Sequence, residues 1–160
     1  MLDFEKDIAK GKIGEDIFIE DFLNFLNIKY KDVTGCQQFQ AIDSDFLTSI
    51  GTYEIKLNYK DNRKIIIEEY TNVNESLSKI SYGWFYKSKA DLLVFISKQT
   101  RTMVLIPFDE NFKKHYNEIK EKSELRRNRI TCHEGKKWQS AFRVIPLDLL
   151  SGYYSMFKKM

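Results

Sequence analysis

The sequence has few cysteines and no long apolar run, and each absence excludes a class of protein. Its two cysteines, Cys36 and Cys132, do not show the spacing of metal ligands, so we expect free thiols in a reducing compartment rather than a disulfide scaffold. No apolar stretch approaches the roughly 20 residues that a membrane-spanning helix needs. The first residues also lack the pattern of a signal peptide. We therefore expect a soluble, cytoplasmic protein with no membrane partner.

A strong excess of charge of either sign is also missing. The 160 residues carry 26 lysines and arginines against 23 aspartates and glutamates, which gives a net charge of +3. Such a balance permits nucleic-acid binding without requiring it, so the distribution of the charges matters more than their sum. The chain shows no internal repeat or low-complexity linker, and 42% of its residues are hydrophobic. This composition predicts one folded domain over residues 1–160, large enough for a hydrophobic core.

Two alternating stretches in the first half of the chain predict a β-hairpin. Polar and apolar residues alternate over Gln37–Leu47 and again over Tyr53–Asn58, which is the period of a half-buried strand. The break between them, Thr48–Thr52, contains the glycine that a tight connection needs. Successive side chains of a strand point to opposite faces. The number of residues in the connecting loop therefore sets which side chains of the two strands share a face.

Such a hairpin gathers several carboxylates and one ammonium group on one face. An even loop places both aspartates of the first strand, Asp43 and Asp45, on the side that carries the glutamate and lysine of the second. These are Glu54 and Lys56. Carboxylates that lie close together repel one another unless a cation lies between them or one takes up a proton. A few oxygen ligands, with room for water and a phosphate, suit Mg²⁺ (or Mn²⁺). A lysine on this face can hold an attacking water or stabilise charge on a phosphate oxygen, so the cluster predicts hydrolysis of a phosphodiester.

One carboxylate of the first helix lies on its apolar side. The apolar spacing predicts a helix over Asp3–Asn27. The residues of its apolar stripe are Ile8, Phe18, Ile19, Phe22 and Leu26. Glu20, Asp21 and Asn24 lie on the opposite face, where we expect them in water. Glu15 lies in the middle of the stripe, where a carboxylate needs a partner. It either pairs with a lysine, caps a turn, or reaches the metal site.

These residues resemble the motif of the PD-(D/E)XK nuclease superfamily. Asp43 or Asp45 is similar to the strand aspartate of that family, and we rank Asp43 first because it follows an apolar residue. The tripeptide Glu54–Lys56 is similar to the acidic-x-lysine element, although Ile42 stands where the family usually has proline. The pair Gly14–Glu15 is similar to the Gly-Glu of the first helix in nucleases and resolvases of this superfamily. There the carboxylate reaches the metal site, which implies that Glu15 is a ligand or orients a metal-bound water.

A second part of the resemblance lies further along the chain. Gly83–Trp84, followed by Ala90–Asp91 and an apolar strand, is similar to a pattern in phage and mobile-element members of the superfamily. Trp84 can stack on a base or pack in the core, and the sequence leaves both open. Lys87 and Lys89, which lie beside it, are suited to contact phosphates.

An acidic pair follows the hairpin. The strand expected over Lys64–Tyr70 ends in Glu68 and Glu69. Glu68 is a candidate for a further metal ligand, and the alternative is that both glutamates are charges that end an edge strand. Further apolar runs predict strands over 92–96, 103–108 and 142–147 and a closing helix over 149–157.

The last third of the chain is basic. A helix is expected over Asp109–Arg127, with Phe112, Tyr116 and Ile119 on its buried face. Five basic residues at and after its end form a basic strip: Arg126, Arg127, Arg129, Lys136 and Lys137. Basic residues at a helix C-terminus also complement the helix dipole, so part of this pattern has an ordinary explanation. With little acidic counterweight, the strip favours contact with a DNA backbone.

The resemblance covers Gly14–Ile106 and implies an α/β fold, with a mixed central β-sheet flanked by helices in a restriction-endonuclease-like core. It implies a metal-dependent DNA endonuclease with Mg²⁺ or Mn²⁺ as cofactor and DNA as partner. Family members include Holliday-junction resolvases, restriction enzymes and phage recombination enzymes, and the sequence does not choose among them. The alternative is a non-catalytic nucleic-acid-binding or regulatory protein that keeps the fold. A homodimer also stays open.

Overall fold

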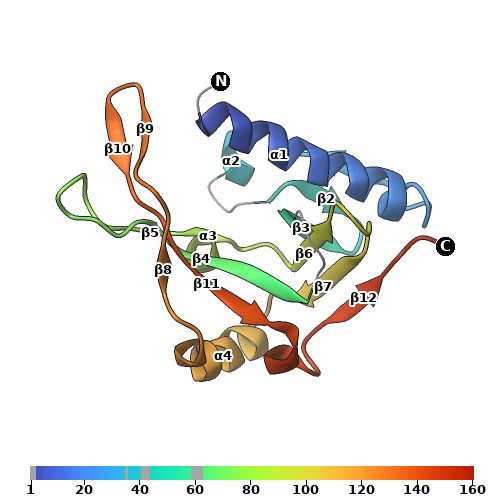
Figure 1. Cartoon of the computed structure of the whole chain (residues 1–160). Helices are drawn as coiled ribbons and strands as arrows, with labels where there is room; N and C mark the ends of the chain where they lie inside the picture. The colour runs from blue at the N-terminus through green and yellow to red at the C-terminus, as the bar shows by residue number, and fades with distance from the viewer. Residues whose placement is uncertain (1–2, 35, 41–43, 59–62) are drawn as a thin grey trace.

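The structure is a computed structural model that describes residues 3–34, 36–40, 44–58 and 63–160. Its largest element is a six-stranded sheet (Figure 1). In spatial order the strands are β1 (Tyr30–Asp32), β2 (Phe46–Thr48), β3 (Gly51–Asn58), β6 (Leu92–Ser97), β7 (Met103–Pro107) and β12 (Ser155–Phe157). Strands β3 and β6 run parallel, and the other neighbouring strands of this sheet are antiparallel. The predicted mixed sheet of an α/β fold is thus confirmed.

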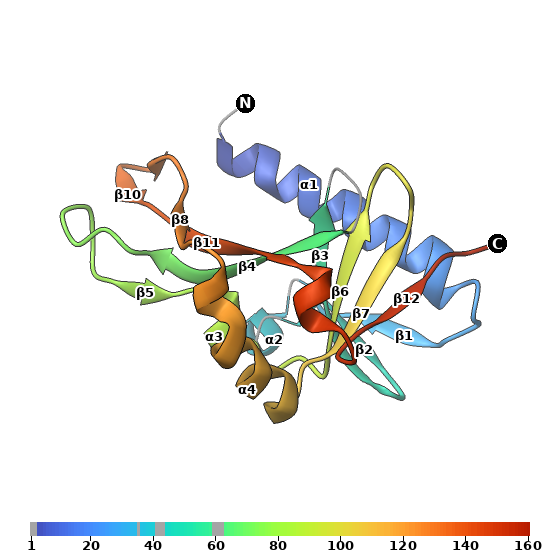
Figure 2. The same ribbon diagram turned by 60° about the horizontal axis from the view of Figure 1, so that its bottom comes forward.

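A second, antiparallel sheet carries part of the basic strip. Its strands, in spatial order, are β5 (Ser81–Tyr82), β4 (Lys64–Asn72), β11 (Ala141–Pro146) and β8 (Arg126–Arg127). Between β8 and β11 the chain forms a two-stranded arm of β9 (Thr131–His133) and β10 (Lys136–Trp138). The arm projects beyond the sheet, on the side of the molecule where the first helix begins (Figures 1 and 2). Its turn, Glu134–Gly135, has positive φ angles of 48° and 76°, as a tight two-residue hairpin connection requires.

One face of the six-stranded sheet is covered by the N-terminal helix (Figure 1). The helix consists of α1 (Asp3–Phe18) and a π-helical turn, η1 (Ile19–Leu23). Phe18 and Phe22 stack with their ring centroids 5.0 Å apart, and both pack against Tyr53 of β3. The helix backbone approaches β3 most closely at Gly14, where an added Cβ would lie 3.3 Å from the Cβ of Leu57. The glycine therefore allows the helix to lie close to the strand that carries the predicted site.

The buried face of this helix differs from the prediction near both ends. Ile8 and Leu26, which the apolar stripe included, are 59% and 44% exposed. Asp21, which was expected in water, is buried, and its Oδ1 accepts a hydrogen bond of 2.9 Å from Arg101 Nη2. A π-helical turn has more residues per turn than an α-helix, so the 100° spacing no longer assigns the faces after Phe18. Asp21 therefore turns toward the protein, where the Arg101 guanidinium compensates its charge.

A second core fills the space between the two sheets. The short helices beside it are α3 (Trp84–Lys87), α4 (Glu110–Ile119), η2 (Lys120–Lys122) and η3 (Leu147–Leu150). The predicted buried face of α4 is confirmed, since Phe112, Tyr116 and Ile119 are all buried. Asp109 caps the helix, and its Oδ1 accepts the Phe112 amide at 2.9 Å. No helix within the described ranges is both long and apolar enough to cross a membrane.

The first strand of the predicted hairpin is much shorter than its alternating pattern suggested. Gln37–Gln40 forms a helical turn, α2, and β2 begins only at Phe46. Glutamine favours helix as readily as other straight-chain residues do, and a short alternating stretch does not exclude one helical turn. The prediction of one strand over residues 37–47 was therefore wrong for its first part.

The C-terminal basic residues do not lie at a helix end. The α-helix ends at Ile119, and Arg126 and Arg127 form β8. Arg143 Nη1 donates to the carbonyls of Lys120 and Ser123, at 3.1 and 2.5 Å, which satisfies these groups where the helical chain becomes extended. The predicted closing helix over 149–157 was also wrong, because η3 is followed there by strand β12.

Candidate active site

The β2–β3 hairpin sets the positions of the predicted carboxylates. Phe46 pairs with Tyr53, and the connecting loop consists of residues 49–50. The Asp45 amide donates at 2.8 Å to the carbonyl of Tyr53, the residue that Phe46 already faces, so the regular pairing ends at Phe46 and the register shifts at Asp45. The even loop on which the sequence argument depended is confirmed.

Asp45 lies at the end of the hairpin ladder and is tied to it twice. Its amide bonds to β3 as above, and its Oδ2 accepts the Ile55 amide at 2.8 Å. Its carbonyl also accepts the Val33 amide at 3.0 Å, which links it to the segment after β1. The side chain is half-buried. Asp43, the other candidate, lies outside the described residues, so the order of the two aspartates stays a prediction.

The turn before β3 is held by the aspartate of the Ala90–Asp91 pair. Asp91 Oδ2 accepts hydrogen bonds from the Thr52 amide at 2.8 Å and from the Thr52 hydroxyl at 3.2 Å. Gly51 has a φ of 131°, and an added Cβ would lie 2.7 Å from Asp91 Oδ2. Only glycine meets both conditions. This aspartate therefore fixes the start of the strand that carries Glu54, which the sequence analysis did not anticipate.

Glu54 and Lys56 form an ion pair on the face of β3 that is turned toward the second sheet. Glu54 is 4% exposed, and its Oε1 accepts a hydrogen bond from Lys56 Nζ. The Lys56 ammonium also lies 5.1 Å from the ring centroid of Trp84, within the range of a cation–π interaction. A buried carboxylate without compensation is costly, so this lysine stabilises its charge. The indole and the carboxylate together restrict where the ammonium can lie.

Glu15 lies near enough to Asp45 for the two charges to interact. The side chain is half-buried, and its pKa rises from 4.5 to about 7, first because of burial and then because of the charges of Asp45 and Asp32. The positive charge of Lys12 opposes this rise, but Lys12 Nζ bonds to Asp16 at 2.7 Å. Pairing with a neighbouring lysine therefore does not account for Glu15. The carboxylate instead faces others, an arrangement that a bound cation would stabilise.

Glu68 approaches the same region from the second sheet. Burial raises its pKa, and the charges of Lys56 and Lys87 partly offset that rise. An added Cβ on Gly83 would lie 2.6 Å from the Glu68 carbonyl, so a glycine is needed where α3 begins. The alternative that Glu68 and Glu69 are charges ending an edge strand was wrong, because β4 continues to Asn72 and pairs on both sides.

Glu69 belongs to a buried network that the sequence analysis missed. Its Oε1 accepts Arg143 Nε at 3.1 Å and the Tyr116 hydroxyl at 2.7 Å. Burial and the bond to Glu69 raise the pKa of Tyr116, so the phenol remains a neutral donor. The signal was present in the sequence, because Arg143 has the strand parity of Ala141 and Ile145, which are buried. The network joins the second sheet to the end of α4.

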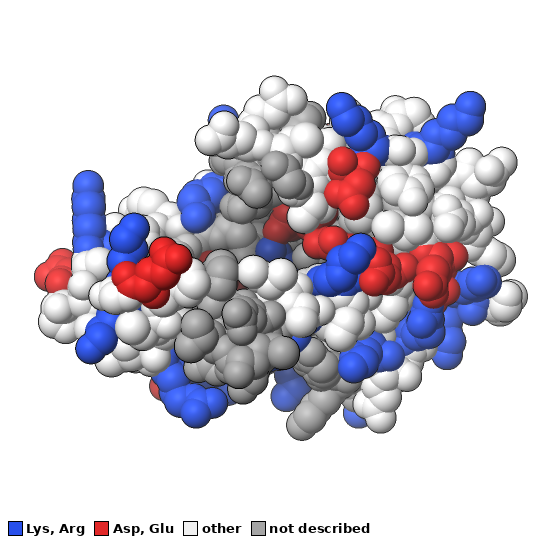
Figure 3. Space-filling view, turned by 90° about the horizontal axis from the view of Figure 1, so that it is seen from above, with Lys and Arg blue, Asp and Glu red and all other residues white. Residues whose placement is uncertain are grey.

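A cavity of about 250 Å³ lies next to Lys56, between the two sheets. It is lined by Lys56, Leu57, Asn58, Ile66, Glu68, Trp84, Phe95, Asn128 and Phe142. Viewed from above, acidic and basic side chains lie together in the hollow at the centre of the molecule, and further lysine and arginine side chains lie around it (Figure 3). The predicted catalytic lysine therefore borders a space that a substrate group can enter.

The predicted DNA contacts fall into two groups. Trp84 is 8% exposed and packs against Phe95 and Phe108, which argues against base stacking and favours core packing. Lys87 and Lys89 beside it are exposed. All members of the basic strip are exposed as well: Arg126, Arg127, Arg129, Lys136 and Lys137. The side chains of these lysines and arginines are thus accessible to a polyanion. Trp84 packs in the core and contacts the Lys56 ammonium through its ring.

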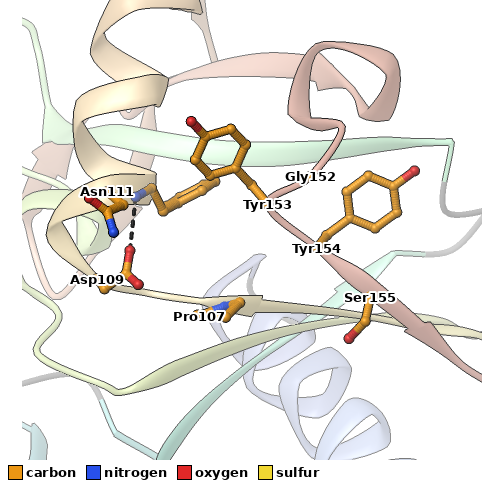
Figure 4. A pocket seen from close by; sticks show the side chains of 8 residues that line it. Pro107, Asp109, Asn111, Gly152, Tyr153, Tyr154 and Ser155 are labelled. Carbon is orange, nitrogen blue, oxygen red and sulfur yellow. Dashed lines mark hydrogen bonds between the residues drawn. The ribbon is translucent and has the colours of Figure 1, made fainter.

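A second depression, of about 380 Å³, lies at the corner between α4 and β12 (Figure 4). Asp109 and Pro107 lie on one side of it, and Tyr154 and Ser155 on the other (Figure 4). None of the predicted site residues lines it. The carboxylate–lysine cluster and this corner are therefore separate features.

The described carboxylates are, in kind, the ligands that a hard divalent ion prefers. Within the described ranges, no three His, Cys, Asp or Glu side chains are grouped so that they could hold a metal ion. Magnesium, however, is commonly held by one or two protein carboxylates together with water and substrate phosphate. Asp45, bonded to the Ile55 amide, and Glu54, the residue before Ile55, are two such carboxylates on or beside β3. The charge of Asp45 also contributes, after burial, to the raised pKa of Glu15.

We found no match to this chain among protein-family models, curated proteins or solved structures. The fold and the site therefore define it as a mixed α/β protein with a buried carboxylate–lysine cluster beside a cavity. Any more specific assignment depends on the chemistry of that cluster.

Proposed function

We propose that this chain is a metal-dependent DNA endonuclease with a restriction-endonuclease-like core, of the PD-(D/E)XK type. The proposal is supported by the pairing of Glu54 with Lys56 on β3 and by Asp45, whose Oδ2 accepts the Ile55 amide of the same strand at 2.8 Å. The charge of Asp45 also contributes, after burial, to the raised pKa of Glu15 in the first helix. These four residues match, in type and in order along the chain, the elements that the resemblance assigns to a metal site.

Asp45 and Glu54 would hold the metal ion, Mg²⁺ or Mn²⁺, and Glu15 would bind it or orient its water. Asp43 and Glu68 remain candidates for further oxygen ligands. When bound, the ion would stabilise charge on the scissile phosphate and lower the pKa of a coordinated water. The crowded carboxylates would then lose their mutual repulsion, which is the physical reason for placing them together.

Lys56 has the second role. In the structure its ammonium lies between the Glu54 carboxylate and the Trp84 ring. From this position it would orient the attacking water or donate to a non-bridging phosphate oxygen as negative charge develops. Hydrolysis then forms a bond between the water oxygen and phosphorus, breaks the bond to the leaving oxygen, and transfers a proton to that oxygen.

The charge distribution supports DNA as the substrate. Arg126 pairs with Phe142, and Phe142 pairs with Glu68, so the three side chains share one face of the second sheet. Phe142 and Glu68 line the cavity, which places the beginning of the basic strip beside it. Lys87 and Lys89 extend the positive surface from α3. A phosphate backbone passing over the cavity would meet cations from both parts.

A cleavage assay with a matched pair of variants tests the proposal. Purified protein should cut plasmid DNA with Mg²⁺ or Mn²⁺ but not with EDTA, and Glu54→Gln should abolish the cut. Glu118→Gln is the control, because Glu118 begins an identical Glu-Ile-Lys tripeptide on an exposed part of α4. DNA binding without cleavage of plasmid, oligonucleotide or branched DNA would favour the non-catalytic alternative.

A further inference from the structure

The cavity beside Lys56 has the chemistry of a site for a flat, polar-edged ring. Its walls include four apolar residues, of which Ile66 and Phe142 are accessible and Trp84 and Phe95 are buried behind them. Two carboxamides, Asn58 and Asn128, also line it. Ile66 is 48% exposed, an apolar side chain left in contact with water at the edge of a cavity. A flat ligand that lies against Phe142 and Ile66 and bonds through its edge would cover this surface.

The two carboxamides are held in place by the protein. Asn58 Nδ2 donates to the Lys64 carbonyl at 3.4 Å, and Asn128 Nδ2 donates to the Ser140 hydroxyl at 2.7 Å. The backbone of Asn128 is fixed as well, since its carbonyl accepts Gln139 Nε2 at 2.9 Å. Carboxamides in fixed positions are suited to recognise the donors and acceptors of a base edge.

The size and location of the cavity limit the ligand further. A volume of about 250 Å³ is below the roughly 300–1,000 Å³ of pockets for drug-sized ligands, so it suits one base rather than a base pair. Lys56, which we place at the scissile phosphate, lines the same cavity. A base that enters it therefore belongs to a nucleotide at or next to that phosphate. A base that is paired and stacked inside a duplex cannot enter such a site.

The geometry points to a site for one unpaired nucleobase, and hence to DNA with an unpaired nucleotide beside the scissile phosphate as the substrate class. Bulges, mismatches, branch points and single strands all present such a nucleotide, and their bases need little or no energy to leave a stack. The inference rests on the proposed nuclease function, because that function places the phosphate at Lys56. The site itself can be tested by binding alone.

Binding of a fluorescent base analogue in EDTA, where no metal-dependent cleavage occurs, gives the direct test. Wild-type protein is titrated with a duplex that carries one bulged 2-aminopurine and with the same duplex in which 2-aminopurine is paired. We expect the bulged duplex to bind roughly tenfold tighter or more, as the stacking of one base would produce. Its emission should also fall as the base moves from water onto the Phe142 ring. Equal affinities with unchanged emission would overturn the inference.

A cavity-filling variant locates the effect. Ile66→Trp puts a large side chain into the cavity from an exposed position, and it should remove the preference for the bulged duplex. Val144→Trp is the matched control, since Val144 pairs with Ile66 on the neighbouring strand but does not line the cavity. Asn128→Leu, which removes a carboxamide at nearly constant size, should weaken the bulged complex alone. If Ile66→Trp and Asn128→Leu both keep the wild-type preference, the base does not bind here.

Cleavage of the same duplexes with Mg²⁺ separates the two proposals. Preferential cutting at the bulge supports both. Equal cutting of bulged and paired duplexes keeps the nuclease and overturns the substrate class. A binding preference without any cleavage keeps the base site and overturns the nuclease.

Discussion

Two copies of the same tripeptide, Glu-Ile-Lys, lie in this chain in opposite surroundings. In Glu54–Lys56 the glutamate is 4% exposed and bonds to the lysine of the same tripeptide. In Glu118–Lys120 the glutamate is exposed, and the lysine instead donates a long hydrogen bond of 3.5 Å to the Tyr86 hydroxyl. The first copy lies on strand β3, and the second spans the end of helix α4.

The difference shows how secondary structure turns one pattern into two kinds of surface. Residues i and i+2 of a strand point to the same face, so Glu54 and Lys56 meet. On a helix, residues two apart point in nearly opposite directions, so Glu118 and Lys120 do not. The isoleucine follows the same logic, since it is buried behind the pair in one case and anchors the helix in the other. A tripeptide carries chemistry only where its backbone brings the charged groups together.

The largest expected effect is on cleavage by variants of the two tripeptides. Glu54→Ala and Lys56→Ala should each lower the cleavage rate by roughly 10²–10³ or more, because each removes a group that stabilises charge in the transition state. Glu118→Ala and Lys120→Ala should leave the rate unchanged. Single-turnover cleavage, with DNA binding measured by fluorescence anisotropy in EDTA, checks both expectations. A parallel loss of binding and cleavage in the Glu54 and Lys56 variants would assign them a structural role.

Metal affinity sharpens the comparison, because the strand copy has an aspartate beside it: Asp45 Oδ2 accepts the amide of Ile55, the middle residue of the tripeptide. Asp45 is bonded to β3 at the Ile55 amide, next to Glu54, whereas Asp43, which the sequence analysis ranked first, lies outside the described residues. We therefore expect Asp45→Asn to weaken Mn²⁺ binding by about tenfold or more, the size of loss that changes at a metal site commonly produce. Calorimetric titration of Asp43→Asn and Asp45→Asn gives the answer. If Asp43→Asn loses the metal and Asp45→Asn keeps it, the sequence-based ranking was right.

The salt dependence of DNA affinity tests whether DNA passes over the Glu54–Lys56 tripeptide. Arg126, Arg127 and Arg129 should each contact phosphate, and neutralising all three should flatten the log–log dependence of affinity on salt by about two to three, at roughly 0.9 per contact. Binding should weaken for every sequence. Because Arg126 and Arg127 lie on β8 and not at a helix end, dipole compensation no longer explains them. An unchanged slope would move the DNA path toward Lys87 and Lys89.

The smallest expected effect is a pH-dependent change in stability at Glu15. Its pKa is 4.5 in the unfolded chain and about 7 in the folded protein. Between these values the folded state binds the proton more tightly, so stability falls as the pH rises to about 7 and then stays level. Glu15→Gln removes this loss, and in EDTA it should raise the melting temperature more at pH 8 than at pH 5. Glu118→Gln, the same substitution at an exposed site, is the control.

Mg²⁺ gives this last test a second arm. If Glu15 faces the ion, Mg²⁺ should raise the melting temperature of the wild type at pH 8 more than that of Glu15→Gln. Equal shifts would place Glu15 away from the metal.

The Glu54–Lys56 pair was predictable because it is local: residues two apart on a strand share a face. Asp45 was expected on that face as well, but its amide bonds to Tyr53, so the alternation does not carry through to it. Glu15 could be singled out because one carboxylate in an apolar stripe is a costly exception, and it is half-buried in the structure. The buried faces of α4 and β6 followed from their apolar periodicity in the same way.

Contacts between distant segments were not predictable from local pattern. Asp21 appeared solvated because its partner, Arg101, lies 80 residues away. Glu69 and Arg143 are separated by 74 residues. They lie on two strands, β4 and β11, whose pairing no pattern within either strand indicates. The basic strip ended in a strand instead of a helix because Arg143 satisfies the carbonyls at the end of α4 and η2. Each of these features depends on a contact between residues that are too far apart in the sequence to fall within one short stretch, so local propensity could not predict it.

The sequence by itself determined the carboxylate–lysine face, because strand alternation is a property of the backbone and needs no partner. Only the tertiary structure decided what surrounds that face. Packing of the second sheet against α3 and β6 placed Trp84 beneath Lys56, brought Glu68 near it, and left a cavity of about 250 Å³ beside the lysine. These positions depend on how two sheets pack, and packing is set by the shapes of side chains that are far apart in the chain.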